Sequence, residues 1–298
     1  MSHGHSHVGS GARYQKRLLL VFGSVIVFLG AEVVAGILTG SLALISDAGH
    51  MATDALGLGM ALAAITAASK ASTGNHRTFG LYRLEILAAL ANAVLLFAVA
   101  GYVIYEAISR INNPTGVAPG PMLVVAVTGL AVNVLGWWIL RTGAADSLNV
   151  EGAFLEVVAD LISSLGVILA ALIVQFTGWV YADPIIALGI GIFILPRAFR
   201  LGQKALRVLM QAAPENIDVG LLGKRLESLD GVTGVHDLHV WTLTSGMPVA
   251  TVHLAATAGA DRDALLAKAM QLLRDEFAVT HATLQVESGS SACVELTW

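Results

Sequence analysis

The sequence has few charged residues and a single cysteine. Charged residues make up 13% of the 298 residues and hydrophobic residues 56%, whereas soluble domains carry about 25% charged residues. This composition excludes a soluble globular protein, and its low charge excludes intrinsic disorder. The net charge of -4 argues against nucleic-acid binding. Because Cys293 stands alone, an internal disulfide or a thiolate-rich zinc finger is excluded, and any metal chemistry must use histidines and carboxylates.

Long apolar segments recur along the first 200 residues. Each is close to the ~20 residues that a membrane-spanning helix needs. The six expected spans are 18–38, 43–68, 84–108, 120–140, 151–175 and 182–200. The first span is too long for a signal peptide and lacks a small-residue cleavage site. The sequence therefore predicts a polytopic α-helical membrane protein with six transmembrane helices.

Basic residues are distributed unevenly between the predicted loops. One side carries Arg13, Lys16, Arg17, Lys70, Arg77, Arg83, Arg141, Arg197, Arg200, Lys204 and Arg207, and the opposite loops contain Arg110 alone. By the positive-inside rule, both termini are expected in the cytoplasm. The expected domains are a histidine-containing tail at 1–17, a transmembrane domain at 18–207 and a cytoplasmic domain at 208–298.

The residues after 208 have the pattern of a small water-facing domain. A helical pattern opens at Pro214 and continues through Leu229, and 261–277 form a second amphipathic helix. Residues 235–243, 249–256 and 282–287 have the character of strands. The order α-β-β-α-β predicts a small C-terminal α+β domain, which we expect to be ferredoxin-like. With few cysteines and no evident targeting segment, the chain is expected in a bacterial inner membrane.

Several ionisable side chains lie inside the predicted spans. They are Glu32, Asp47, His50, Asp54, Glu156 and Asp160. An aspartate at the bilayer centre costs at least ~2.5–3.5 kcal/mol on insertion scales, so each such group needs a reason. No lysine or arginine is expected deep in a span to pair with them. Buried carboxylates without a protein counter-charge must be protonated or must bind a cation from solution.

The spacing of these groups indicates a metal site. His50 and Asp54 are four residues apart, as are Glu156 and Asp160, so each pair shares one helix face. Two such helices would present one imidazole and three carboxylates, a set that suits Zn²⁺, with Co²⁺ and Cd²⁺ as relatives. The alternative is that these groups only form interhelical hydrogen bonds. Asp47 is either an entry group or a helix cap, and Glu32 either a proton relay or a hydrogen-bond partner.

The motifs around these residues resemble those of the cation diffusion facilitators, which are divalent-metal/proton antiporters. The matching segments are SDAGHMATD at 46–54, NVEGA at 149–153, EVVAD at 156–160, FG at 79–80, RLE at 83–85, HDLHVW at 236–241 and HATLQVE at 281–287. The resemblance implies a homodimer with six helices per protomer and a transport site between the second and fifth helices. It also implies metal export in exchange for protons.

Glu156 departs from the pattern of many zinc-transporting members, which have histidine at this position. A harder ligand set would also admit Mn²⁺ or Fe²⁺. One histidine with three carboxylates also occurs in zinc-carrying relatives, so Zn²⁺ remains the first expectation. Proton exchange also follows from the ligands themselves: a metal requires a neutral imidazole and ionised carboxylates, so protonation expels it.

Histidines are also concentrated outside the membrane. The resemblance implies a second, regulatory metal site of His236, His253, His281 and Glu287 that tightens the dimer; ordinary surface histidines are the alternative. His239 is expected on the opposite strand face from His236 unless a bulge intervenes. The tail residues His3, His5 and His7 bind metal weakly or have no role. His76 stands alone, and no site is predicted there.

Two other classes of function use similar residues. An intramembrane metalloenzyme would activate water on the same ligands, but the sequence has no HExxH motif, and all four ligand positions are filled by protein groups. A metal-sensing scaffold would need the membrane site only for structure. We expect a secondary transporter rather than an enzyme. Its expected partners are divalent cations, protons, the lipid bilayer and a second copy of the chain, without nucleic acid.

Overall fold

The computed structural model describes residues 10–70, 79, 81–141 and 148–288. Within its helices, the side chains of 10–21, 57–70, 140 and 148–156 are not described. The chain divides into two compact units, Met1–Gly59 with Ala91–Arg200 and Met60–Leu90 with Leu201–Trp298.

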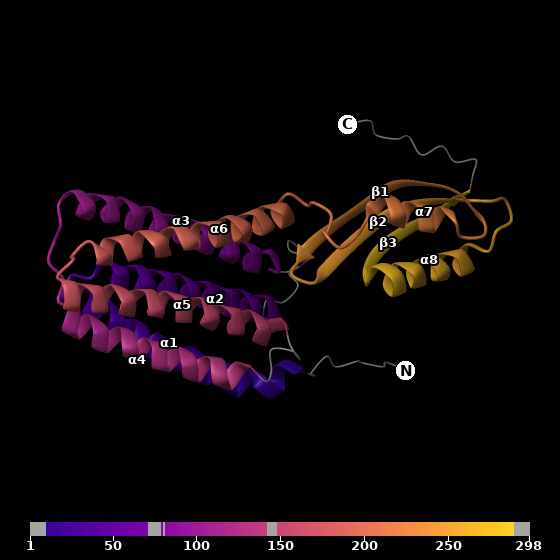
Figure 1. The fold of residues 1–298 in the computed structure, drawn as a ribbon. Helices are drawn as coiled ribbons and strands as arrows, with labels where there is room; N and C mark the ends of the chain where they lie inside the picture. Colours follow the sequence, from indigo (N-terminus) through magenta and orange to yellow (C-terminus); the bar gives the residue numbers. More distant parts are fainter. Residues whose placement is uncertain (1–9, 71–78, 80, 142–147, 289–298) are drawn as a thin grey trace. The chain divides into compact units, whose positions relative to one another are not determined.

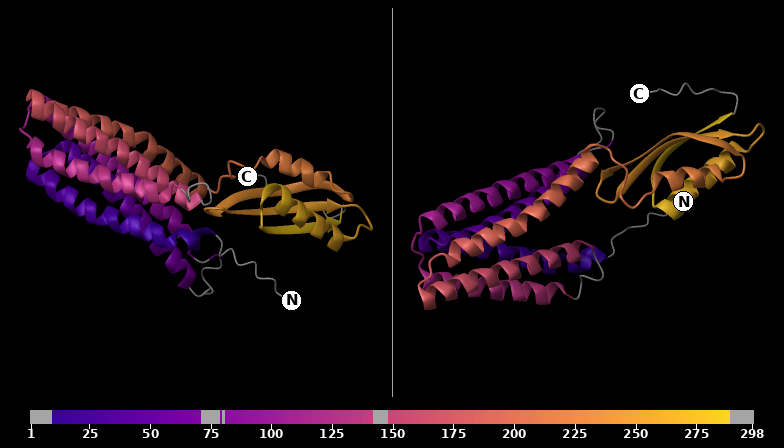
Figure 2. Two further views of the ribbon diagram at one scale, coloured as in Figure 1. Left: turned by 60° about the horizontal axis from the view of Figure 1, so that its bottom comes forward. Right: turned by 45° about the horizontal axis from the view of Figure 1, so that its top comes forward.

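Six long helices make up the first two thirds of the described chain (Figure 1). They are α1 (Ser10–Thr39), α2 (Leu42–Lys70), α3 (Arg83–Asn112), α4 (Pro119–Leu140), α5 (Leu148–Thr177) and α6 (Ala182–Leu209). All of them except α2 are long and apolar enough, within the described residues, to cross a membrane. The helices lie side by side as a bundle (Figure 2), and large apolar side chains such as Val27, Tyr105 and Phe176 are exposed on it. These features confirm the predicted polytopic helical membrane protein.

Small residues allow the helices to approach each other closely. A Cβ atom added at Gly129 on α4 would lie 2.4 Å from Phe28 Cζ on α1. One added at Gly49 on α2 would lie 2.8 Å from Val99 Cγ1 on α3. Both distances are too short for a real contact, so a Cβ atom at either position would force the neighbouring side chain to move. Gly49 directly precedes His50, and the second crossing therefore sets the position of a predicted ligand.

The first turn of α2 is capped by a carboxylate from α6. Asp183 accepts hydrogen bonds from Ser41 Oγ at 2.6 Å, Leu42 N at 2.8 Å and Ala43 N at 3.2 Å. These N–H groups have no partner within their own helix, and the positive end of the helix dipole also favours a carboxylate there. Because Asp183 is in the first turn of α6, α2 and α6 begin at the same end of the bundle.

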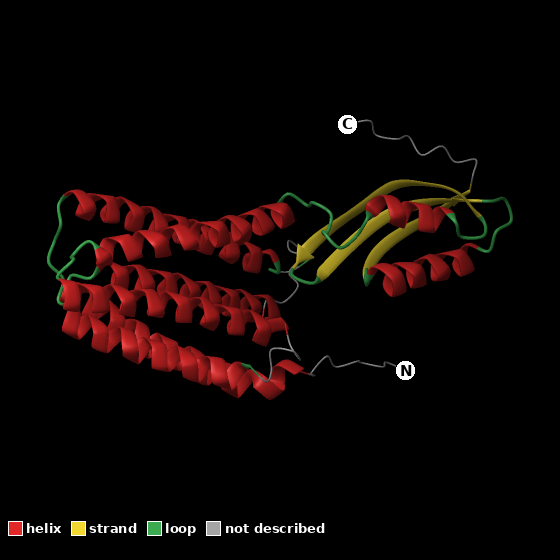
Figure 3. Ribbon diagram, in the orientation of Figure 1, coloured by secondary structure: helices red, strands yellow, loops and turns green. Residues whose placement is uncertain are grey.

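The C-terminal domain has two helices on one face of a three-stranded sheet (Figure 3). Its elements are α7 (Val219–Glu227), β1 (Val232–Thr244), β2 (Met247–Ala256), α8 (Arg262–Phe277) and β3 (His281–Ser288). The strand order is β1-β2-β3, with β1 antiparallel and β3 parallel to β2. This confirms the predicted α-β-β-α-β order and the small α+β domain.

Alternation along the strands separates a core face from an open face. On β2, Val252 and Leu254 are fully buried against α7 and α8, whereas His253 between them is only half-buried. On β3, Leu284 and Val286 pack on the same core. Because successive side chains alternate across a sheet, His253 and Glu287 lie on the face away from the helices.

Candidate metal centres

The membrane helices bring three of the predicted ligands together. His50 and Asp54 come from α2 and Asp160 from α5. His50 Nε2 lies 3.6 Å from Asp54 Oδ2 and 3.9 Å from Asp160 Oδ1. All three ligand atoms lie within 4.8 Å of one another. These spacings are close to the ~3.3–3.6 Å expected between ligands of a tetrahedral ion with bonds of ~2.0–2.2 Å.

Two of these side chains are buried, Asp54 is partly exposed at 20%, and all three are incompletely hydrogen-bonded. His50 is 1% exposed and Asp160 6%. His50 Nδ1, Asp54 Oδ2 and Asp160 Oδ1 have no hydrogen-bond partner within the described part of the chain. Buried polar atoms normally find a partner. Asp54 Oδ2 and Asp160 Oδ1 both face His50 Nε2, and such convergent carboxylate oxygens are suited to a cation.

Glu156 lies on α5, four residues before Asp160. Its side chain is outside the described residues, so its role as the fourth ligand stays a prediction. The i,i+4 relation holds in the helix, which places Glu156 and Asp160 on one face of α5.

Glu32 and Asp47 form a second buried carboxyl pair. Each is 1% exposed, the two carboxyl groups are close enough to interact, and Glu32 Oε2 and Asp47 Oδ1 have no hydrogen-bond partner within the described residues. Asp47 lies five residues inside α2, which begins at Leu42. It is therefore not the cap of that helix, a function that Asp183 performs.

The structure corrects one expectation from the sequence: an arginine does pair with these groups. Arg197 Nη2 lies 3.5 Å from Asp54 Oδ2, and Arg197 Nη1 lies 3.4 Å from His50 Nε2. From the sequence, we expected Arg197 among the basic residues of the loops on one side of the membrane. However, α6 continues through Pro196 to Leu209 and carries the guanidinium alongside α2. Arg197 was missed because apolar periodicity does not tell which neighbouring helix a residue faces.

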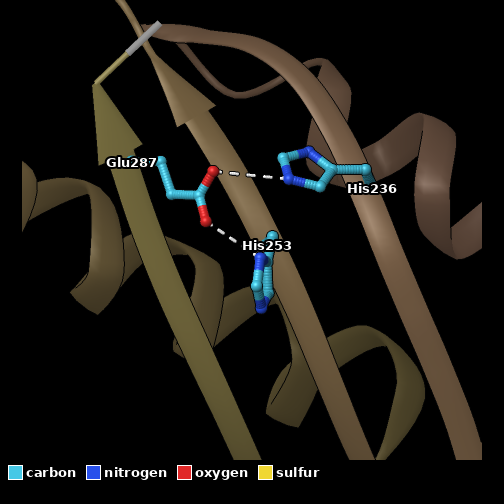
Figure 4. A group of neighbouring side chains, drawn as sticks. All are labelled: His236, His253 and Glu287. Carbon is cyan, nitrogen blue, oxygen red and sulfur yellow. Dashed lines mark ion pairs between the residues drawn. The ribbon is translucent and has the colours of Figure 1, made fainter. Parts of the chain in front are cut away.

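A second cluster lies on the open face of the C-terminal sheet (Figure 4). Glu287 on β3 is 2.9 Å from His253 Nδ1 on β2 and 3.4 Å from His236 Nε2 on β1. One ligand atom from each of the three residues lies within 4.8 Å of the other two. Gln285 Nε2 donates to Glu287 Oε1 at 2.8 Å.

The side chains of His236, His253 and Glu287 are suited to bind a metal ion. His236 Nε2 is buried and has no hydrogen-bond partner within the described residues. Two imidazoles and one carboxylate are ligands that Zn²⁺ accepts. Three ligands from one chain would leave a coordination position for a further group.

The other predicted histidines lie apart from this cluster. His281 begins β3 and pairs with Val249, and its six-residue separation from Glu287 is about 20 Å along a strand. A bulge between His236 and His239, with Asp237 at φ 51°, returns His239 to the His236 face. There His239 is exposed, beside the cluster rather than in it. His3, His5, His7 and His76 are outside the described residues.

Comparison with known proteins gives matches over most of the chain. Residues 18–210 match the profile of the cation efflux transmembrane domain, and residues 214–289 that of the cation efflux protein cytoplasmic domain. The metal cation efflux system protein CzcD of Cupriavidus metallidurans is 46% identical, over 96% of this chain and 89% of its own. Zinc transporter ZitB of Escherichia coli is 40% identical over 96% and 93%. The cadmium, cobalt and zinc/H(+)-K(+) antiporter of Bacillus subtilis is 39% identical over 96% and 92%.

Proposed function

The chain belongs to the cation efflux family, and from this membership we propose that it exports Zn²⁺ from the cytoplasm in exchange for protons. It is a membrane transporter of metal cations and not an enzyme. The observation that carries the proposal is the convergence of His50, Asp54 and Asp160 between α2 and α5, where three buried ligand atoms lie within 4.8 Å. Glu156 supplies the fourth ligand in this account.

The ligand set supports a Zn²⁺-like substrate. One imidazole with carboxylates forms a compact N/O site of the kind Zn²⁺ occupies, and Co²⁺ and Cd²⁺ are related substrates. The relatives are named for zinc, cobalt and cadmium. A carboxylate at Glu156 makes the site harder, so Mn²⁺ or Fe²⁺ is the alternative substrate.

The chemistry of the ligands supports coupling to protons. Protonation of His50 removes the lone pair that a metal needs, and protonation of Asp54 or Asp160 neutralises its ligand charge. A site that opens to the cytoplasm would load metal, and the same site open to the other side would take up protons and release it. The name of the Bacillus subtilis relative, which includes H(+), supports this exchange.

The C-terminal domain provides support for a homodimer that is regulated by metal. The cluster of His236, His253 and Glu287 would bind a regulatory metal ion that stabilises the domain and the homodimer.

We propose that both termini lie in the cytoplasm, because the basic residues gather on that side of the predicted spans. The protein would then reside in a bacterial inner membrane.

The test compares Asp160→Asn with Asp275→Asn in proteoliposomes. Both variants remove one carboxylate charge, but Asp275 is exposed on α8 and accepts a hydrogen bond from Gln271 of the same helix. Zn²⁺ flux in Asp160→Asn should fall by more than about tenfold, since even outer partners of metal ligands are worth about 10–100-fold. Asp275→Asn should transport like the wild type. Equal flux in the two variants would contradict the proposed site.

A further inference from the structure

Arg197 contacts the same atoms that a metal in the membrane site would need. His50 Nε2, the atom nearest to both carboxylates of the site, lies 3.4 Å from Arg197 Nη1. Asp54 Oδ2 lies 3.5 Å from Arg197 Nη2. The guanidinium therefore bridges two of the three ligands that come from α2 and α5.

The contact with His50 uses the lone pair on which coordination depends. A guanidinium has only donors, so a hydrogen bond in this contact requires the tautomer in which His50 Nε2 is the acceptor. An imidazole nitrogen has one lone pair, and a hydrogen bond and a metal bond cannot use it together. Metal binding at His50 Nε2 therefore requires that Arg197 leave it.

The charge of Arg197 is permanent. Arginine stays protonated in proteins, so a change in pH does not remove this cation from the site. A divalent cation held by His50, Asp54 and Asp160 would face it at short range, and two like charges repel strongly in a partly buried environment. The side chain of Arg197 is 31% exposed, and its long aliphatic stem allows the charged end to withdraw to a wetter position.

Arg197 and Asp183 of α6 both contact α2. Asp183 binds the first turn of α2, and Arg197, fourteen residues later on α6, reaches Asp54 further along α2. Fourteen residues of helix extend about 21 Å, so the helices run parallel with contacts at two levels. The Asp183 contact contains no metal ligand and persists when Arg197 withdraws.

We propose that Arg197 is a tethered counter-cation of the transport site, and this inference rests on the proposed function of that site. The guanidinium balances the ligands when the metal has left and competes with the incoming metal for Asp54 Oδ2 and His50 Nε2. The competition weakens metal binding and speeds metal release. Arg197 thereby sets affinity and turnover without being a ligand.

The test compares Arg197→Gln with Arg200→Gln. Arg200 lies three residues further on α6, is exposed, and donates to Pro196 O of its own helix. Its replacement removes the same charge from the same helix. Zn²⁺ binding is measured by competition with a chelating dye, and the component lost in Asp160→Asn identifies the membrane site. Arg197→Gln should lower the dissociation constant of that component about tenfold or more, and Arg200→Gln should leave it unchanged.

Transport kinetics separate competition from a structural role. Arg197→Gln should lower both KM and kcat for Zn²⁺ flux, because the metal binds more tightly and leaves more slowly. Arg197→Lys, which keeps the charge, should lie closer to the wild type in both constants. If Arg197→Gln binds Zn²⁺ with the affinity of the wild type, or with a lower affinity, the inference is overturned.

A measurement on the unaltered protein avoids any failure of the variants to fold. Phenylglyoxal modifies exposed guanidinium groups, and mass spectrometry reports the extent at Arg197 and Arg200. Zn²⁺ should increase modification of Arg197 and leave Arg200 unchanged. Unchanged or reduced modification of Arg197, in protein whose Zn²⁺ binding depends on Asp160, would overturn the inference. Loss of the Asp160-dependent binding itself would instead contradict the proposed function.

Discussion

A single imidazole distinguishes the membrane site from an all-carboxylate site. His50 is 1% exposed and lies within 4 Å of Asp54 and Asp160, at 3.6 and 3.9 Å. Nitrogen ligands favour Zn²⁺, Co²⁺ and Cd²⁺, whereas purely oxygen sites favour Mn²⁺ and Mg²⁺. In the proposed mechanism, the choice of metal depends on His50, and the ease of its release depends on Arg197.

Replacing His50 with aspartate should change the preferred metal. The variant His50→Asp retains a ligand at the position but makes every predicted ligand an oxygen. The ratio of Zn²⁺ to Mn²⁺ transport should fall about tenfold or more, equivalent to about 1.4 kcal/mol. Flux of each metal into proteoliposomes measures the ratio. An unchanged ratio would mean that His50 does not coordinate the metal.

At the scale of helices and strands, a few contacts between helices position the candidate ligands and the C-terminal helices. Gly49, directly before His50, packs against Val99 of α3, and Asp183 of α6 caps α2. In the C-terminal domain, α7 and α8 are joined by Arg225, which donates to both carboxylate oxygens of Glu276, at 2.8 and 2.5 Å. Each element is thus located by a few specific contacts in addition to apolar burial.

Adding a methyl group at Gly49 should disturb the α2–α3 contact. The new Cβ would lie 2.8 Å from Val99 Cγ1, and valine cannot easily rotate away within a helix. Gly49→Ala should lower stability by about 1–3 kcal/mol, the usual cost of overpacking, and should reduce transport. Gly101→Ala on α3 is the control, because a Cβ there meets nothing within 4 Å. Equal thermal unfolding temperatures for the two variants would show that the contact relaxes freely.

The Arg225–Glu276 pair should stabilise the C-terminal domain only above acidic pH. The hydrogen bond from Arg225 lowers the pKa of Glu276, so its stabilisation is complete above about pH 4.3, the ordinary glutamate value, and is lost as pH falls through the lower folded value. Glu276→Gln should therefore destabilise the domain near neutrality and have no effect in strong acid. Thermal unfolding of the full chain across this range tests the prediction. A difference that grows on acidification would contradict the sign.

At the scale of the whole molecule, the chain combines a candidate metal site in the membrane helices with a separate candidate site on the C-terminal sheet. The second site joins all three strands, with His236 from β1, His253 from β2 and Glu287 from β3. A metal there would link the strand pairings and stabilise the folded domain by mass action.

Zn²⁺ should stabilise the wild-type C-terminal domain, and His253→Ala should abolish this effect. At a free concentration about 100 times the dissociation constant, one bound ion contributes about 2.7 kcal/mol. His239→Ala is the matched control, because His239 is exposed on the same face outside the cluster. Thermal unfolding with and without Zn²⁺, followed by addition of a chelator, measures the effect. If His239→Ala lost as much of the stabilisation by Zn²⁺ as His253→Ala, the assigned ligands would be contradicted.

The sequence was sufficient for features that depend on short spacings. The i,i+4 pair of His50 and Asp54 indicated one helix face, and the character of residues 282–287 indicated the strand that the structure shows at His281–Ser288. Features that depend on tertiary packing could not be read in this way. The contact of Arg197 with α2 depends on how α6 is rotated in the bundle, and the bulge at Asp237 depends on a single residue with positive φ. Aspartate tolerates that conformation, but its presence does not require it.

Simultaneous recording of metal and proton movement tests the central claim most directly. Proteoliposomes carrying the wild-type protein, with a metal-sensitive dye and a pH-sensitive dye, are given Zn²⁺ across an imposed pH gradient. We predict that Zn²⁺ and protons move in opposite directions and that the two fluxes have the same rate constant. In Asp160→Asn, both fluxes should be lost. Zn²⁺ movement without proton movement, or an unchanged rate in Asp160→Asn, would contradict exchange through the site between α2 and α5.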